Sequence, residues 1–317
     1  MAVVIVAVIV TLALVGGLVM NAFQSLGTRP PAPGTTIVAP SDSKATQAAA
    51  DATGGSDAQA AAEYLASQPT AYWLTPEADP VDEVWNRIAA LAADAREQDA
   101  ALAVVVYGLP ERDCGNLSAG GLDDASYVTW TQQIGDALRN ASDLQRIVIL
   151  EPDSLALAPE CGNVDARTTQ LRGAADRLAG PGIWTYLDGG HSDWLSAGEM
   201  AGLIRGVGLQ NIRGFATNVS NYNATDDEVA YAHELAGLLD GAHAVIDTSR
   251  NGRGSNGEWC NPRGREVGEP GGSIGDDVVD TNLWIKPPGE SDGTCNGGPV
   301  AGTWWPDAAI ELTRAAR

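Results

Sequence analysis

The chain has 317 residues, with 19 Lys and Arg against 41 Asp and Glu, which gives a formal net charge of −22 at pH 7. A chain this acidic is not expected to bind nucleic acid, and its 44% hydrophobic content excludes disorder throughout. Its three histidines and four cysteines include no Cys-x-x-Cys pair and no His-x-x-x-His spacing, so we expect no metal site and no cofactor.

An apolar run opens the chain. Between Val3 and Met20 the only polar side chain is Thr11, and the first charged residue is Arg29. A run of this length can enter or span a bilayer, so residues 1–28 are interpreted as a signal peptide or a membrane anchor. A signal peptide begins with basic residues, which are missing, so either the true start lies upstream or the segment is an uncleaved anchor. We therefore expect an extracellular protein, secreted or anchored at the outer face of the membrane.

Residues 29–55 are rich in Pro, Ala, Ser and Thr and show no apolar period, which predicts a linker. A single folded domain is then expected over residues 56–317. All four cysteines lie in it, at Cys114, Cys161, Cys260 and Cys295. An even number of cysteines in an exported chain favours two disulfides over free thiols, with three possible connectivities.

Short β-branched or aromatic runs alternate with amphipathic stretches of helical length through this domain, which predicts βα units around a parallel sheet. The strand-like runs are residues 71–75, 101–110, 146–152, 183–188, 214–219, 244–248 and 282–286, and helix-like segments include 80–96, 126–140 and 227–239. Seven such strands fit a barrel better than an open sheet. We therefore predict an α/β fold, a distorted seven-stranded parallel β/α barrel of the TIM-like kind.

Polar residues follow most of the predicted strands, at the carboxyl ends where barrel active sites are built. Asp113 and Asp153 end consecutive strands and are expected to face one cleft, where mutual repulsion keeps one of them protonated as a general acid. Glycoside hydrolysis needs such a carboxyl pair. The alternative for Asp153 is a cap on the following helix.

Tryptophans indicate the class of substrate. Trp73, Trp194, Trp259 and Trp284 lie at or just after predicted strand ends, where flat indole faces can stack on sugar rings. Several such platforms along a groove suit a polymer. Trp85 and Trp130 lie on helix-like segments and are assigned to the core instead.

Six ordered blocks resemble glycoside hydrolase family 6, the inverting β-1,4-glucanases and cellobiohydrolases. They are VVYGLPERDC at 105–114, ILEPDSLA at 149–156, YLDGGH at 186–191, GFATNVSNYN at 214–223, DTSRNG at 247–252 and LWIKPPGESDG at 283–293. The resemblance extends from about residue 68 to the C-terminus, roughly four fifths of the chain.

The resemblance implies four catalytic residues. Asp153 matches the general acid, and Asp113 matches the carboxylate that holds its proton and helps to manage the attacking water. Asp292 matches the proposed base, with a water chain as an alternative proton relay. Tyr107 matches the tyrosine that presses the sugar at the cleavage point toward a distorted ring.

The resemblance also implies the substrate contacts. Those on the glycone side are Trp73, Trp259, Lys286 and Glu290, and those on the leaving-group side are the stacking residue Trp194 with the polar residues His191 and Asn218. Asp188 matches an aspartate near the leaving-group side that gives structural or electrostatic support. The implied disulfides are Cys114–Cys161 and Cys260–Cys295.

This chain departs from the family pattern at three places. Gly108 stands where the family often has Asp, and Ala197 replaces a second leaving-side Trp. Ala119 stands where a loop serine is common, and Ser118 lies one position off. Shorter or weaker binding on the leaving-group side is therefore expected.

Short loops favour endo action. Only Gly293 and Thr294 separate Asp292 from Cys295, and residues 296–302 are all that precede the closing segment, whereas a cellobiohydrolase roofs its cleft with long insertions here. We expect a monomeric endo-β-1,4-glucanase (cellulase) that hydrolyses cellulose or soluble β-glucan with inversion. The alternatives are an exo-acting cellobiohydrolase and a catalytically silent carbohydrate-binding protein. A serine esterase is disfavoured because the Gly-x-Ser-x-Gly match at 289–293 has no His after it.

Overall fold

The computed structural model describes residues 28–52 and 54–317. The apolar run assigned to a signal peptide or anchor lies outside these residues, apart from residue 28. Among the described residues, none of the helices combines the length and apolar character needed to cross a membrane.

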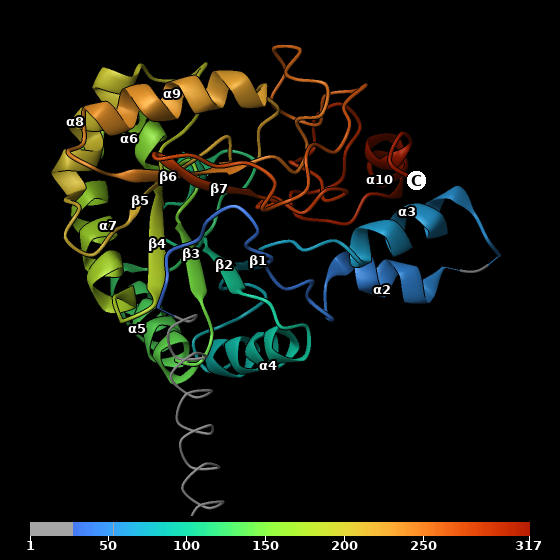
Figure 1. Cartoon of the computed structure of the whole chain (residues 1–317), viewed down its shortest axis with the longest axis horizontal. Helices are drawn as coiled ribbons and strands as arrows, with labels where there is room; N and C mark the ends of the chain where they lie inside the picture. Colours follow the sequence, from blue (N-terminus) through green and yellow to red (C-terminus); the bar gives the residue numbers. More distant parts are fainter. Residues whose placement is uncertain (1–27, 53) are drawn as a thin grey trace, which may run out of the picture.

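Seven parallel strands form one curled sheet in sequential order (Figure 1). They are β1 (Tyr72–Leu74), β2 (Leu102–Val106), β3 (Arg146–Leu150), β4 (Ile183–Asp188), β5 (Gly214–Thr217), β6 (His243–Asp247) and β7 (Val279–Leu283). The edge strands β1 and β7 do not pair as strands within the described chain. Just beyond them the Ala71 N–H donates to the Trp284 carbonyl oxygen at 2.9 Å. The predicted distorted barrel is therefore confirmed as a curled half-barrel whose two edges come into contact just beyond the edge strands.

Helices cover the outer face of this sheet (Figure 1). They are α4 (Val84–Glu97), α5 (Asp124–Asn140), α6 (Ser154–Cys161), α7 (Val164–Leu178), α8 (Ala197–Val207) and α9 (Thr225–Gly237). Every residue of β2 and β3 is buried, because one face packs on helices and the other fills the barrel interior. Ser196 and Glu199 form a reciprocal capping box that starts α8.

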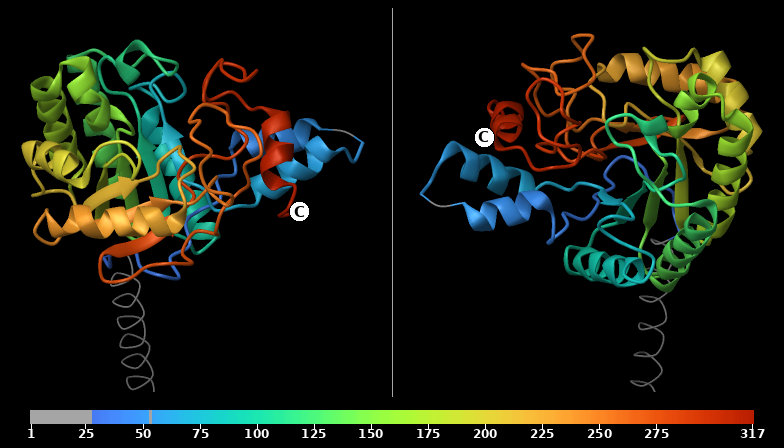
Figure 2. Two further views of the ribbon diagram at one scale, coloured as in Figure 1. Left: turned by 90° about the horizontal axis from the view of Figure 1, so that it is seen from above. Right: turned by 180° about the vertical axis from the view of Figure 1, so that it is seen from behind.

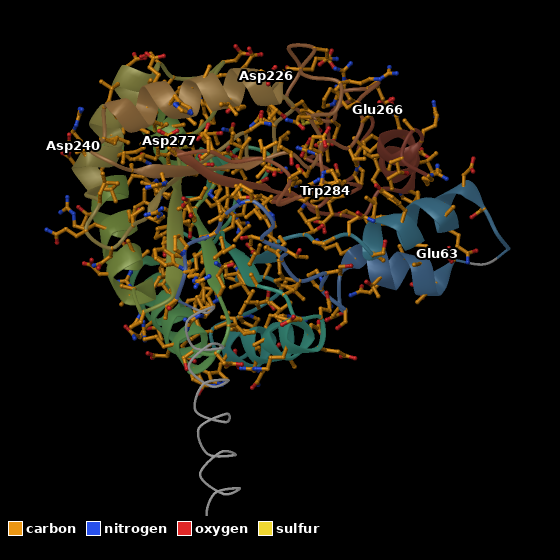
Figure 3. The ribbon with its side chains drawn as sticks, viewed as in Figure 1. Glu63, Asp226, Asp240, Glu266, Asp277 and Trp284 are labelled. Carbon is orange, nitrogen blue, oxygen red and sulfur yellow. A yellow bond between two sulfur atoms is a disulfide. The ribbon has the colours of Figure 1, made fainter. Side chains whose placement is uncertain are left out.

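A small helical cluster lies beside the barrel and consists of α2 (Lys44–Asp51), α3 (Asp57–Ala66) and α10 (Pro306–Thr313) (Figures 1 and 2). Its apolar contacts join Ala45, Leu65 and Ala309 to Trp284, which is 2% exposed. Figure 3 shows Trp284 between this cluster and the barrel, and acidic residues such as Glu63, Asp226 and Asp240 at the periphery.

The prediction that residues 29–55 form a linker is wrong. Ile37 and Val38 are fully buried, and Ile37 bridges Ala101 in parallel at the start of β2. Ser43 then caps α2 through its side chain, which accepts from the Thr46 N–H. Two apolar residues give no detectable period, yet they suffice to dock this segment, because the neighbouring β2 supplies the surface that they bury against.

Three further expectations are corrected. Strand β7 ends at Leu283 and not at residue 286, because the Trp284 side chain turns into the helical cluster. Trp284 is therefore buried and cannot stack on a sugar. Trp85 is 37% exposed, since the buried face of α4 runs through Val84, Ile88 and Leu91 and position 85 points away from it. Trp130 is fully buried, as predicted.

A substitution at Gly214 tests how closely the backbones of β5 and β6 approach each other. An added Cβ would lie 1.7 Å from the His243 carbonyl oxygen, which is backbone and has no room to move. We expect Gly214→Ala to lower the free energy of unfolding by about 1–3 kcal/mol, measured by chemical denaturation.

Gly198→Ala is the matched control. Gly198 lies on helix α8 with no atom within 4 Å of an added Cβ, so this change should be neutral or stabilise by about 0.5–1 kcal/mol. Equal stability of the two variants would contradict the close β5–β6 contact.

Candidate active site

A cleft of about 1580 Å³ lies along the carboxyl ends of the strands. It brings together ten of the residues predicted from the sequence, which are Trp73, Tyr107, Asp113, Asp153, His191, Trp194, Trp259, Lys286, Glu290 and Asp292. Trp73 lies on β1 and the others follow β2, β3, β4, β6 and β7, so the topology collects them from segments far apart in the chain.

Asp153 follows β3 and lies half-buried at the bottom of the cleft. Its backbone adopts the left-handed region with φ 66°, and its side chain makes no capping hydrogen bond to α6. The helix-cap alternative is therefore wrong. Burial raises the pKa of Asp153 to about 7, with further contributions from the charges of Asp113 and Asp292, while Lys286 acts in the opposite direction. A substantial fraction of this carboxyl is protonated near neutral pH.

Asp113 lies in the loop after β2, half-buried in the same cleft. Its Oδ2 accepts the Ser118 N–H at 2.8 Å, so the loop that departs from the family pattern still holds this carboxylate through its backbone. Burial raises the pKa of Asp113. The disulfide Cys114–Cys161 joins Cys114, the residue after Asp113, to the end of α6, the helix that follows Asp153.

Both of these loops contain residues with a left-handed backbone. Glu111, Asp113, Glu151 and Asp153 all have φ between 50° and 66°, a region that residues other than glycine seldom adopt. A strained backbone of this kind persists only where the surrounding contacts hold it in place, and it is found most often at functional sites.

Aromatic rings line the cleft near the acid. The rings of Trp73 and Tyr107 meet edge to face at 5.1 Å, and the Lys286 Nζ lies 5.2 Å from the Trp73 ring centre. The Trp73 indole N–H donates to the Ile285 carbonyl oxygen at 2.8 Å, which fixes the ring across the seam between β1 and β7. Trp259 is 59% exposed at the rim.

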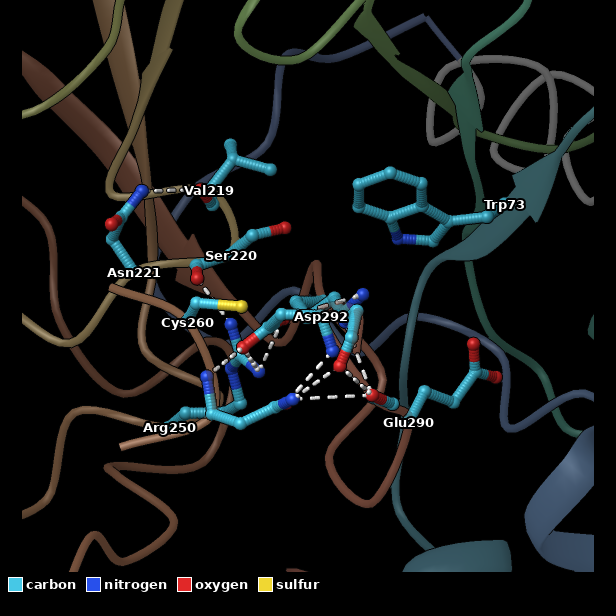
Figure 4. A network of polar contacts seen from close by, with 12 residues as sticks. Trp73, Val219, Ser220, Asn221, Arg250, Cys260, Glu290 and Asp292 are labelled. Atoms are coloured by element: carbon cyan, nitrogen blue, oxygen red, sulfur yellow. Dashed lines mark hydrogen bonds and ion pairs between the residues drawn. The ribbon is translucent and has the colours of Figure 1, made fainter. Parts of the chain in front are cut away.

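Asp292 is the centre of a network of donors (Figure 4). Its carboxylate accepts from Arg250 Nη1 at 2.9 and 3.1 Å, from the Tyr222 hydroxyl at 3.2 Å and from the Asn261 N–H at 3.0 Å. The Lys286 Nζ lies 3.7 Å away. The disulfide Cys260–Cys295 joins the two loops that carry this network, as the resemblance implies.

Two of the predicted contact residues do not line the cleft. Asn218 is fully buried, its Nδ2 donates to the Asp247 and Asn223 carbonyl oxygens, and its Oδ1 accepts the Asn223 N–H. All of its polar atoms hold loops together, so the substrate contact expected of it is wrong. Asp188 is 1% exposed and accepts the N–H groups of Asp153 and Gly190, which is a supporting role.

Sequence reasoning missed four polar residues that shape the site. The buried Glu151 accepts the Gly108 N–H, the buried Asp247 accepts four backbone N–H groups, and Arg250 pairs with Asp292. Lys44 of α2 reaches Glu290 at 2.9 Å. The first three lie inside the blocks that resemble family 6, so their positions in those blocks could have identified them. Lys44 lies in the segment predicted to be a linker, where nothing pointed to the cleft.

Gly108 has a steric explanation. An added Cβ would lie 2.6 Å from the Trp130 ring and 3.0 Å from Pro76. The Asp that the family often carries here cannot fit unless the buried Trp130 moves. Glycine at this position therefore matches the local packing.

The glycosyl hydrolases family 6 model matches residues 33–316. The chain belongs to this family. The match begins inside the segment predicted to be a linker, in agreement with its place in the fold.

Three relatives illustrate the family 6 similarity. Endoglucanase A of Cellulomonas fimi is 42% identical over 267 residues, and endoglucanase 1 of Streptomyces halstedii is 38% identical over 287. The endoglucanase Cel6 from Mycobacterium tuberculosis, solved with methyl-cellobiosyl-4-deoxy-4-thio-β-D-cellobioside, is 36% identical with a TM-score of 0.81, covering 92% of this chain and 99% of that one. The match to the Cellulomonas protein covers 84% of this chain and 58% of that protein. The match to the Streptomyces protein covers 86% of each.

The pair Arg250–Asp292 is expected to contribute strongly to stability. Both side chains are at most 6% exposed, so Arg250→Met leaves a buried carboxylate without its main partner. We expect the free energy of unfolding to fall by about 3–5 kcal/mol in chemical denaturation.

The exposed pair Arg96–Asp143 provides the control, with side chains 45% and 53% exposed. Arg96→Met should cost less than about 1 kcal/mol. Similar losses in the two variants would contradict the special weight given to the buried pair.

Proposed function

We propose that the protein is a secreted or membrane-anchored endo-β-1,4-glucanase that hydrolyses internal bonds of cellulose or soluble β-glucan with inversion. One observation carries the proposal: a carboxyl whose pKa is raised to about 7, Asp153, lies beside Asp113 in a cleft lined by tryptophans. Family membership and the endoglucanase relatives support the same activity.

In the proposed mechanism Asp153 is the general acid. A protonated carboxyl donates its proton to the glycosidic oxygen as the bond to the leaving sugar breaks. Its raised pKa keeps that proton available near neutral pH. Asp113 holds the proton on Asp153, because a second negative charge nearby disfavours ionisation.

The attacking water is proposed to approach from the opposite face of the sugar, with Asp113 helping to manage it. An inverting enzyme needs space for this water between its carboxyl groups. Asp292 is proposed as the base that receives the water proton, directly or through a water chain. Arg250 pairs with this carboxylate at 2.9 Å and the Lys286 Nζ lies 3.7 Å from it, so the side chain is held in a fixed position.

The glucan is proposed to lie along the tryptophans. Trp73 and Trp259 stack on the glycone side and Trp194 on the leaving-group side, while Lys286, Glu290 and His191 bind hydroxyl groups. Tyr107, 7% exposed beneath the cleavage point, presses the ring toward distortion. The hydroxyls of an uncharged sugar suit this mixture of apolar faces and polar groups.

Endo action is supported by the exposed rim. Trp259 and Val300 line the cleft and are 59% and 65% exposed, so they are not roofed by the described loops. An open cleft admits the middle of a chain, whereas a tunnel must thread an end. The alternatives remain an exo-acting cellobiohydrolase and a silent binding protein.

An extracellular location agrees with the disulfides. All four cysteines pair in the structure, and such bonds persist in oxidising compartments. We propose that the chain acts as a monomer outside the cell and meets a membrane only through its N-terminal segment, if that segment is uncleaved.

Asp153→Asn tests the proposed acid. On carboxymethylcellulose we expect the rate to fall by about 10²–10⁴, because the amide cannot supply the proton, while binding of the glucan is retained. Asp143→Asn, on the exposed pair with Arg96, is the matched control and should keep full activity.

The assay follows viscosity together with reducing ends. Rapid thinning by the wild type alone supports endo action at Asp153, whereas slow thinning with release of soluble cellobiose supports the exo alternative. No release by the wild type favours the silent binder, and full activity of Asp153→Asn would place the acid elsewhere.

Asp113→Asn tests the coupling of the two carboxyls. After burial, the Asp113 charge is the largest cause of the raised pKa of Asp153, so its removal lowers that pKa. The acid then loses its proton at lower pH, and the alkaline limb of the kcat/KM profile should shift toward lower pH. An unmoved limb in this variant, with Asp143→Asn as reference, would contradict the coupling.

A further inference from the structure

A chain of polar contacts runs from the cleft into the protein through His191, Asn223 and Glu228. His191 follows β4 and Asn223 lies in the loop after β5, and both line the cleft. Glu228 lies on α9 and is fully buried. The catalytic mechanism uses neither Asn223 nor Glu228, yet together they contact the imidazole on the leaving-group side.

The hydrogen bonds at His191 Nδ1 identify its role. The backbone N–H of Asp193 lies 3.3 Å from Nδ1, and the Asn223 Nδ2 lies 2.9 Å from it. A backbone N–H can only donate, so Nδ1 is an acceptor and carries no proton.

Glu228 decides the orientation of the Asn223 amide. Its Oε1 lies 3.1 Å from Asn223 Nδ2 and also accepts the Ser192 N–H at 2.9 Å. This oxygen already accepts a backbone N–H and serves as an acceptor for the amide as well, so the Asn223 NH₂ is turned toward it. Of the two amide hydrogens, one then points to Glu228 and the other to His191 Nδ1, the shortest of these contacts, while the Ser192 Oγ lies farther away at 3.3 Å.

A neutral imidazole without a proton on Nδ1 has one on Nε2. Burial lowers the pKa of His191, against a smaller opposing effect of the Asp193 charge, so the ring is neutral at pH 7. Within the described chain Nε2 has no hydrogen-bond partner, and the ring centre lies 5.5 Å from that of Trp194.

We propose that Asn223 and Glu228 are positioning residues that hold His191 as the neutral Nε2–H tautomer, so that the cleft offers a fixed hydrogen-bond donor to a sugar hydroxyl oxygen beside Trp194. The identity of the acceptor rests on the proposed function. The tautomer does not, because it follows from contacts within the free protein.

The first test is ¹⁵N–¹H NMR of the imidazole groups at about pH 7 in the free protein. The chain has only three histidines, so His233 and His243 serve as internal references, and His191→Gln assigns the signal. We expect the neutral Nε2–H pattern for His191. A neutral Nδ1–H pattern or an imidazolium would overturn the proposal, whatever the activity of the enzyme.

A double variant exchanges the two polar groups without a change of net charge. Asn223→Asp with Glu228→Gln places a carboxylate opposite Nδ1, which should then become protonated, and the titration midpoint of His191 should rise by about one unit or more. Glu228→Gln alone keeps an oxygen acceptor for Asn223 and should retain the Nε2–H pattern. Asn221→Asp, in the same loop, controls for an added carboxylate. An unmoved midpoint in the double variant would contradict the role of Asn223.

Ligand titration tests the acceptor. In the Asp153→Asn background, cellotetraose should shift the His191 Nε2–H signal, whereas maltotetraose should not. An unmoved signal at saturating cellotetraose would overturn the recognition role. If neither sugar binds while the tautomer is as expected, the proposed function fails and the positioning by Asn223 and Glu228 stands.

Discussion

Buried polar side chains at the carboxyl ends of the strands hold the active-site loops in place, and the rest of the site depends on them. Asp247 shows the principle, because its two oxygens accept the N–H groups of Ser220, Ser249, Ile285 and Lys286. These groups come from the loops after β5, β6 and β7. A buried N–H without a partner costs free energy, so one carboxylate that satisfies four of them fixes three loops together.

The same device recurs around the curled sheet. Glu151 at the end of β3 accepts from the loop after β2, and Asp188 at the end of β4 accepts from the loops after β3 and β4. Each of these carboxylates links the end of a strand to the backbone of a neighbouring loop, so residues from separate βα units keep fixed positions. The strained backbone of Asp113 and Asp153 is held by this network and by the disulfide beside it.

The burial that holds these loops in place also affects the acid–base properties of the carboxyl groups in the cleft. Burial raises the pKa of Asp153 to about 7, while Asp292 pairs with Arg250 and lies 3.7 Å from the Lys286 Nζ. Two carboxyl groups of one cleft therefore have different surroundings, since only Asp292 is paired with a buried arginine.

The sequence by itself determined the parallel βα architecture, the order of the strands and most cleft residues, because period, strand-end position and family blocks are local properties of the chain. Only the tertiary structure decided the burial of Trp284 and Asn218, the exposure of Trp85, and the docking of residues 29–55. It also decided the proton position inferred for His191. In each case the environment comes from segments distant in sequence, and the free energy of burial or hydrogen bonding exists only once those segments pack together.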